Sequence, residues 1–297
     1  MLRDEIVIPP ISEQDVMIVC DSLFLDNPII FYVSSYYCLY ESNREVVAIH
    51  PVYQFSKQDI LRNIDSIYSY LKQFDSIKSM DDYGKELFIH DFCLKQMKYD
   101  YTFCKSSFSV IGPIIHKIAV CEGISKLVKL IFDYTGIRCI VVEGRVTNPM
   151  TGIIEAHAWN VVEIFGQFYH LDVTFDLTLT NEQNRYDYFN LSDNEIKRDH
   201  IIKGYTPPCI SMNHNFFIRN SLQMNSLQDL KNFFTHSFNQ RRTSLLFRAD
   251  FSHNDGDIGN LIIDTVKRMP MPIYRKNCQM ELRANKNQMV YEINFIV

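Results

Sequence analysis

The chain has 297 residues, of which 46% are hydrophobic, and a formal net charge of −5 at pH 7. This length exceeds the usual size of one domain, so we expect two or three packed units. The negative charge, without any cluster of Lys or Arg, argues against a protein that binds nucleic acid electrostatically.

No stretch approaches the roughly 20 apolar residues of a membrane span. The N-terminal stretch MLRDEIVIPPISEQDV has no apolar core of signal-peptide length. Eight cysteines lie far apart, with neither a C-x-x-C pair nor a metal-ligand spacing. We therefore expect a cytoplasmic protein with reduced thiols and no membrane partner, although export by another route stays open.

The region up to about residue 80 is predicted to hold a helix, a strand pair and a second helix. A turn signal at 26–28 precedes the strand-like stretch IIFYVSSYYCLY. Ser56 and Asp59 resemble a capping box with Asp in place of Glu, which opens a helix over 57–74. The apolar stripe of that helix indicates a packing surface.

Cys121 opens the amphipathic run CEGISKLVKLIFDYTG, in which apolar residues recur every three or four positions. This spacing predicts a helix, and Gly136 predicts its end. Cys121 then lies at or just before the first turn, where free N–H groups and the helix dipole favour a thiolate. These N–H groups can also receive an oxyanion. Taken alone, however, Cys121 is better explained as a small buried hydrophobic side chain.

Two short segments downstream, 156–164 and 167–176, are rich in β-branched and aromatic residues and flank Phe165-Gly166. This pattern predicts a β-hairpin with a two-residue turn. An even-length turn fixes which side chains share a face of the hairpin, and an odd one would reverse them.

In this register His157 lies opposite Thr174 and Asp172 lies opposite Trp159. His157 and Asp172 then share a face, one diagonal step apart, with Cα atoms about 7–8 Å from each other. An imidazole and a carboxylate can close that gap to a hydrogen bond. A thiol needs a base, and the base needs a partner that holds its orientation, so the three residues predict an activated thiol site.

The stretch from about Tyr99 to His200 resembles the core of the transglutaminase-like superfamily of papain-type cysteine enzymes, which includes bacterial transglutaminase-like domain proteins. The resemblance rests on VCEGISKLVKLIFDYTGIRCIVVEG (120–144), HAWNVVEIFGQFYHLDVTFD (157–176) and DYFNLSDNEIKRDH (187–200). The run IHDFCLKQMKYD (89–100) also resembles the helix that precedes this core.

The resemblance implies that Cys121 is the nucleophile, His157 the base and Asp172 the orienting acid. Phe175 stands where many members have tryptophan, and the residue that completes the oxyanion hole is not placed. The implied fold class is α+β, with the nucleophile helix packed on an antiparallel sheet. We expect an N-terminal α/β region over 1–80, a catalytic core over 81–205 and a small C-terminal α+β layer over 206–297.

The C-terminal region follows Pro207-Pro208 and is expected to be a structural or substrate-selecting appendage. Its predicted order, β-α-β-α-β-β, suggests a layer of the ferredoxin-like kind. The predicted elements are a strand (215–219), a helix (226–238), a strand (244–250), a helix (257–268) and two strands (278–284 and 289–297).

Two further histidines, His90 and His170, lie near the predicted core. His90, beside Asp91 on a predicted helix, is best explained by a structural hydrogen bond. His170 lies on the same hairpin face as Asp172, where it either lines the cleft or covers the strand.

The leading hypothesis is an enzyme that attacks an amide or ester carbonyl of a peptide or protein substrate and forms a thioester. Water would resolve it in a peptidase or amidase, which we favour slightly, and an amine would do so in a transglutaminase or amide synthase. The chemistry requires no metal or organic cofactor. The competing hypothesis is a binding module for peptides or proteins on the same fold, with the triad inert. Oligomeric state is not indicated by the sequence.

Overall fold

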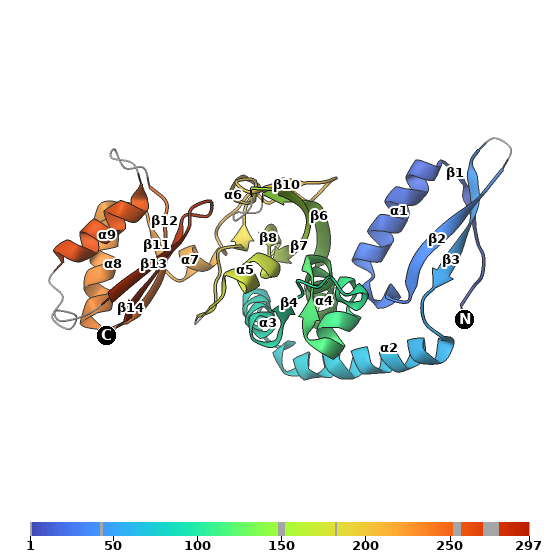
Figure 1. Cartoon of the computed structure of the whole chain (residues 1–297), viewed down its shortest axis with the longest axis horizontal. Coiled ribbons are helices and arrows are strands. Elements are labelled where there is room, and N and C mark those ends of the chain that lie inside the picture. The colour runs from blue at the N-terminus through green and yellow to red at the C-terminus, as the bar shows by residue number, and fades with distance from the viewer. Residues whose placement is uncertain are drawn as a thin grey trace.

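The computed structural model describes residues 2–41, 44–147, 152–181, 183–251, 257–269 and 279–296. It is a mixture of helices and strands, as the predicted α+β class requires. Figure 1 shows an N-terminal group of elements at one end, a C-terminal group at the other and a central group between them. Within the described ranges, no helix combines the length and apolarity that a bilayer crossing demands.

The N-terminal group combines a three-stranded antiparallel sheet with one packed helix. Its elements are β1 (Ile6–Ile11), α1 (Glu13–Asp26), β2 (Val33–Tyr40) and β3 (Val46–Tyr53). The strand order is β1-β3-β2, and α1 buries Val16 and Cys20 against Val46 of β3.

Helix α2 (Lys57–Leu71) connects this group to the central one (Figure 1). It begins where predicted, because the Ser56 hydroxyl accepts a hydrogen bond from the Asp59 N–H. A 3-10 helix then continues from Lys72 to Ile77.

The central group contains a five-stranded antiparallel sheet in the order β10-β6-β7-β8-β9, with helices against it. Its strands are β4 (Lys98–Tyr99), β5 (Ile118–Ala119), β6 (Cys139–Thr147), β7 (Ile154–Ile164), β8 (Gln167–Leu171), β9 (Phe189–Leu191) and β10 (His200–Ile202). Its helices are α3 (Asp82–Gln96), α4 (Cys121–Thr135), α5 (Val173–Leu179) and α6 (Asp193–Ile196). Strands β4 and β5 form a short parallel pair apart from the main sheet.

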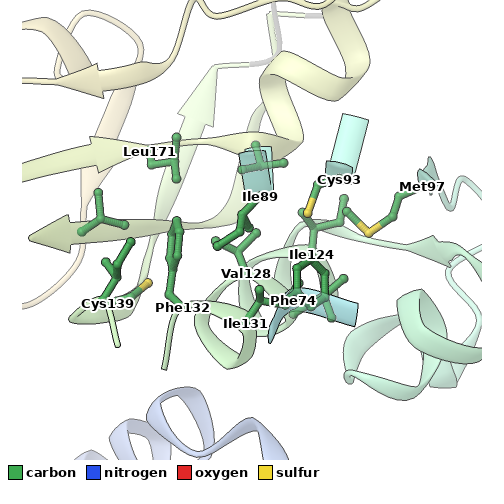
Figure 2. Close-up of a cluster of buried hydrophobic side chains, with 14 of the residues drawn as sticks. Phe74, Ile89, Cys93, Met97, Ile124, Val128, Ile131, Phe132, Cys139 and Leu171 are labelled. Atoms are coloured by element: carbon green, nitrogen blue, oxygen red, sulfur yellow. The ribbon is translucent and has the colours of Figure 1, made fainter. Parts of the chain in front are cut away.

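The main hydrophobic core lies around α4, which packs on β6 and β7. Figure 2 shows side chains of α4 gathered with Leu171 of β8, Cys139 of β6 and Ile89 of α3. The apolar residues that recur every three or four positions in this helix therefore form its buried face. The α4 residues with no exposed surface are Ile124, Leu127, Val128, Ile131 and Phe132. The helix ends at Gly136, whose φ of 84° is the left-handed conformation expected there.

The β7–β8 hairpin has the predicted two-residue turn. Phe165 and Gly166 have φ values of 50° and 78°, as a type I′ turn requires, and Ile164 pairs with Gln167. The predicted register is confirmed as far as the pair Asn160–Leu171.

Beyond Leu171 the prediction of a strand to residue 176 is wrong. The chain turns into helix α5, so Thr174 is helical and does not lie opposite His157. The reason is local: the Asp172 carboxylate accepts a hydrogen bond from the Phe175 N–H at 3.0 Å and caps the helix. This cap outweighs the strand preference of β-branched and aromatic residues.

The C-terminal group is a four-stranded sheet with two longer helices. Its elements are α7 (Phe216–Arg219), β11 (Gln223–Met224), α8 (Leu227–Asn239), β12 (Ser244–Ala249), α9 (Ile258–Arg268), β13 (Gln279–Asn285) and β14 (Val290–Ile296). The prediction of a strand at 215–219 is wrong. The Asn215 side chain accepts a hydrogen bond from the Phe217 N–H and caps the short helix α7 there. The other predicted elements form.

The prediction of a ferredoxin-like layer is also wrong. From β11 to β14 the elements follow the order β-α-β-α-β-β, whereas the ferredoxin-like fold follows the order β-α-β-β-α-β. The observed sheet runs β11-β12-β14-β13, with β11 parallel to β12.

We predict that Phe132→Ala lowers the free energy of unfolding of the central group by about 3–5 kcal/mol, because it leaves a cavity under α4. The single tryptophan, Trp159, is fully buried in the central sheet and reports this transition by fluorescence in a denaturant titration. Leu61→Ala, at an exposed position of α2, should change the free energy of unfolding by no more than about 0.5 kcal/mol. Equal effects of the two variants would contradict this placement of the core.

Candidate active site

Cys121 is the first residue of α4, and its side chain is partly exposed. Its position leaves the N–H groups of the first helical turn without intrahelical partners beside the sulfur. The preceding residue, Val120, donates its N–H to the Ser107 carbonyl at 3.1 Å. A Cβ on Gly123 would lie 2.1 Å from that same Ser107 oxygen, so only glycine permits this close approach.

Asp100 fixes the turn that carries Ser107. Its carboxylate accepts hydrogen bonds from the Ser107 hydroxyl at 2.5 Å, from the Thr102 N–H at 2.8 Å and from the Cys104 N–H at 2.9 Å. The hydroxyls of Ser107 and Thr102 hold the pKa of Asp100 well below its usual range. Asp100 was not predicted from the sequence, although Asp commonly forms turns in which its side chain bonds the backbone two residues on.

His157 and Asp172 form a dyad in hydrogen-bond contact, as expected, although Asp172 caps α5 and does not pair across the hairpin. His157 Nε2 lies 2.6 Å from Asp172 Oδ2, and the two side chains come from β7 and from the residue that follows β8. His157 is 7% exposed and Asp172 is fully buried. Because Nε2 is occupied, Nδ1 is the ring nitrogen left for Cys121, which lies near enough to contribute to the pKa of His157.

The electrostatics of the dyad favour the charged imidazole. Burial opposes protonation of His157, but the charge and hydrogen bond of Asp172, with a smaller contribution from Cys121, raise its pKa to about 10. Burial likewise acts to raise the pKa of Asp172. The positive charge and hydrogen bond of His157, together with the hydrogen bond of His200, outweigh burial and hold that pKa well below its usual range.

A second histidine shares the Asp172 carboxylate. His200, the first residue of β10, places Nε2 3.1 Å from Asp172 Oδ2 and Nδ1 2.6 Å from Asp199 Oδ1. His200 is 2% exposed. Sequence reasoning included this residue in the resembling segment but assigned it no role. The adjacent acid in the Asp199-His200 pair was the available signal.

Aromatic rings line the dyad. The Phe175 ring centroid lies 4.7 Å from that of His157 and 5.0 Å from that of His200, and Trp159 is stacked on His157 at 6.0 Å. Phe175, at the position where the resembling family often has tryptophan, thus covers both imidazoles. Such an apolar lining strengthens the charge interactions of the dyad.

The other two histidines support the fold. His170 is fully buried, accepts the Trp159 indole N–H at 3.0 Å and lies 3.0 Å from Asp193, so it covers the strand and does not line a cleft. Burial lowers the pKa of His170 to about 4. His90 makes the expected bond to Asp91 at 3.3 Å and a second one to Asp176 at 3.1 Å.

Two groups of side chains in the described part of the chain have the geometry to hold a metal ion, with ligand atoms within 4.8 Å of one another: His157, Asp172 and His200, and His170, Asp193 and Cys209. In both groups each histidine already hydrogen-bonds a carboxylate of its own group. A metal ion would have to displace these bonds.

No family model and no curated protein matches the sequence. Solved structures that are similar to part of this chain include a TGase, with 12% identity and a TM-score of 0.35, covering 61% of this chain and 53% of that one. A candidate cysteine protease from Cytophaga hutchinsonii has 16% identity and a TM-score of 0.29, covering 44% and 51%. A candidate protease from Parabacteroides distasonis has 13% identity and a TM-score of 0.29, covering 47% and 36%.

This chain therefore spans about half or less of the length of each matched structure. Because the TM-scores are below 0.5, the roles proposed for the site residues rest on the geometry of this chain alone.

We predict opposite charge states for two buried histidines at pH 7. His157, with a pKa of about 10, should be protonated, and His170, with a pKa of about 4, should be neutral. NMR titration of 15N-histidine-labelled protein measures both. Asp172→Asn should lower the pKa of His157 by removing the negative charge, and it should leave His170 unchanged.

The same shift has a defined effect on stability. Because the pKa of His157 exceeds its ordinary value of 6.5, its protonation contributes stability that is complete below pH 6.5 and is lost as the pH rises to about 10. A neutral His157 at pH 7 in the wild type would contradict the dyad electrostatics.

Proposed function

We propose that this protein is a cysteine-dependent acyl-transfer enzyme that acts on peptide or amide carbonyls. The observation that carries the proposal is one arrangement: a partly exposed thiol at a helix start beside an imidazole that a fully buried carboxylate holds at 2.6 Å. These are the three parts that an activated thiol requires. Cys121 is the proposed nucleophile, His157 the acid–base group and Asp172 its orienting partner.

In the acylation step the Cys121 sulfur attacks the carbonyl carbon of the substrate. The oxygen that becomes negative faces the N–H groups at the start of α4, which are suited to stabilise it. Collapse of the tetrahedral intermediate breaks the C–N bond and leaves a thioester on Cys121. His157 transfers its proton to the departing amine, and the pKa of about 10 keeps that proton available at neutral pH.

Water is the acceptor that we favour for the thioester. Cys121 is partly exposed, so water reaches the acyl group without any rearrangement of the site. Transfer to an amine would require the acyl-enzyme to be shielded from water. His157 would remove a proton from the attacking water, and the thiolate would leave.

The alternative is a module that binds peptides or proteins with an inert triad. A binding module does not need a reactive Cys121, whereas the proposed enzyme needs Cys121 to be an activated thiol. Selective reactivity of that thiol therefore separates the two.

We predict that iodoacetamide alkylates Cys121 rapidly below pH 7. In His157→Ala the rate at pH 6 should fall about 10–100-fold, because an ordinary thiol with a pKa near 8.5 is almost fully protonated there. Mass spectrometry of each cysteine between pH 5 and pH 9 measures the rates. Cys104, an exposed thiol in the same chain, is the internal control and should respond equally in both proteins. If Cys121 reacts no faster than Cys104 at pH 6, the thiol is not activated and the binding-module hypothesis gains.

We also predict cleavage rather than amine transfer. A quenched-fluorescent peptide library, with and without a fluorescent alkylamine, should give hydrolysed products whose yield the amine barely changes. Cys121→Ala should reduce turnover by about 10⁴-fold or more, because it removes the nucleophile. Products that carry the amine in excess over free acid would instead identify a transferase.

A further inference from the structure

The turn between β13 and β14 in the C-terminal group reaches the hydrogen-bond network behind the proposed triad. Gln288 in this turn is 1% exposed, and its Nε2 lies 3.3 Å from both carboxylate oxygens of Asp199. The same nitrogen donates to the Glu195 carbonyl at 3.2 Å. Asp199 is the acid that holds His200 at 2.6 Å.

A second side chain of this turn reaches the same carboxylate through a tyrosine. Asn285 Nδ2 donates to the Tyr188 hydroxyl at 3.2 Å, and that hydroxyl donates to Asp199 Oδ2 at 2.6 Å. Asn285 also accepts the backbone N–H of Gln288 at 3.3 Å, which fixes the shape of the turn. Asp199 is therefore held from the C-terminal side by two connected routes.

We propose that the C-terminal group completes the active site: its β13–β14 turn holds Asp199, Asp199 orients His200, and His200 is a positioning residue that fixes Asp172 for its bond to His157. The inference rests on the proposed function, since it concerns the same thiol site. It assigns the C-terminal group a part in catalysis beyond that of a structural or substrate-selecting appendage.

The donor geometry supports a positioning role for His200. Asp172 receives three donors from three different elements: His157 and His200 on Oδ2 and the Phe175 N–H on Oδ1. A carboxylate held at both oxygens cannot rotate away from His157. Removal of His200 leaves Oδ2 with a single partner in a fully buried setting.

Imidazoles and carboxylates alternate along this chain of contacts. Both nitrogens of His200 face carboxylate oxygens, Nδ1 that of Asp199 and Nε2 that of Asp172. The same Asp172 oxygen lies against His157. Asp199 and its contacts from Gln288 and Tyr188 anchor the outer end.

Buried ion pairs hold the C-terminal group in the position that this network needs. Arg185 of the central group is 2% exposed and pairs with Glu292 of β14 at 3.1 Å. Arg248 of β12, also 2% exposed, pairs with Glu195 of α6. Breaking the Arg185–Glu292 pair would leave the buried Glu292 carboxylate without this cation, which disfavours separation of the two groups. The arginines themselves keep second partners, Asp187 for Arg185 and Asp250 for Arg248.

The alternative is that the network only joins the two groups. If the network only joins the two groups, substitutions in it should lower the stability of the protein and leave the reactivity of Cys121 unchanged. The pH profile of Cys121 alkylation is therefore the decisive readout, with the thermal transition of Trp159 fluorescence as the measure of stability.

The variants are His200→Ala, His200→Gln and Gln288→Ala in the full-length protein. In His200→Ala we expect the alkylation rate of Cys121 at pH 6 to fall about tenfold, as for an upward shift of the profile by about one pH unit. His200→Gln keeps an amide donor near Asp172 and should restore part of the loss. Gln288→Ala, which touches neither His157 nor Asp172, should shift the profile in the same direction by a smaller amount.

The matched control is His90→Gln. His90 is another fully buried histidine paired with a buried aspartate, Asp176. Its hydrogen bonds and ring contacts in the described structure are to Asp91, Asp176, Tyr186 and Phe189, not to the proposed triad. It should lower the thermal transition without moving the alkylation profile.

The outcomes separate this inference from the proposed function. If the wild type shows fast labelling below pH 7 and both His200→Ala and Gln288→Ala retain its profile, the positioning role is overturned and the proposed function stands. If the wild type lacks fast labelling, both are overturned. Should His200→Ala fail to fold, Gln288→Ala alone decides, because its side chain lies in the turn at the far end of the network.

Discussion

The structure around the candidate site depends on keeping the charge of Asp172 in a place that water does not reach. An ionised carboxylate with no exposed surface is tolerated only when hydrogen bonds and opposite charges replace its hydration. The three groups that do so belong to β7, β10 and α5, so this single carboxylate ties together elements that are distant in the sequence. The low pKa of Asp172 and the high pKa of His157 are two consequences of the same arrangement.

Asp172 has three structural roles at once. It follows the last residue of β8, it caps α5 through Oδ1, and its Oδ2 lies 2.6 Å from His157 Nε2. The cap sets where the strand stops, and the type I′ turn at Phe165-Gly166 sets the register that brings the carboxylate near His157. A change that moves the strand end therefore also moves the dyad, which explains why backbone geometry and site chemistry cannot be separated here.

Much of this was predictable where the determinants are local. The apolar period of α4, its end at Gly136 and the register of the β7–β8 hairpin follow from patterns within about fifteen residues. The start of α5 was mispredicted because Val173, Thr174 and Phe175 favour a strand, whereas the cap at Asp172 decides otherwise. His200 was missed for another reason. Its neighbour Asp199 is a local signal for a hydrogen bond, but the contact of His200 with Asp172 joins residues 28 positions apart, which no local pattern predicts.

The same argument applies to the C-terminal group, which the sequence predicted to be a structural or substrate-selecting appendage. Its contribution becomes visible only when the buried pairs Arg185–Glu292 and Arg248–Glu195 are considered together with Gln288. Buried charges add little net stability compared with apolar packing, but they strongly disfavour any arrangement that leaves one of them unpaired. The contact between the central and C-terminal groups is therefore better suited to fix their relative orientation than to add stability to their association. One orientation is also what the network behind Asp172 requires, because a hydrogen-bonded chain from Gln288 through Asp199 to His200 tolerates only small displacements at each step.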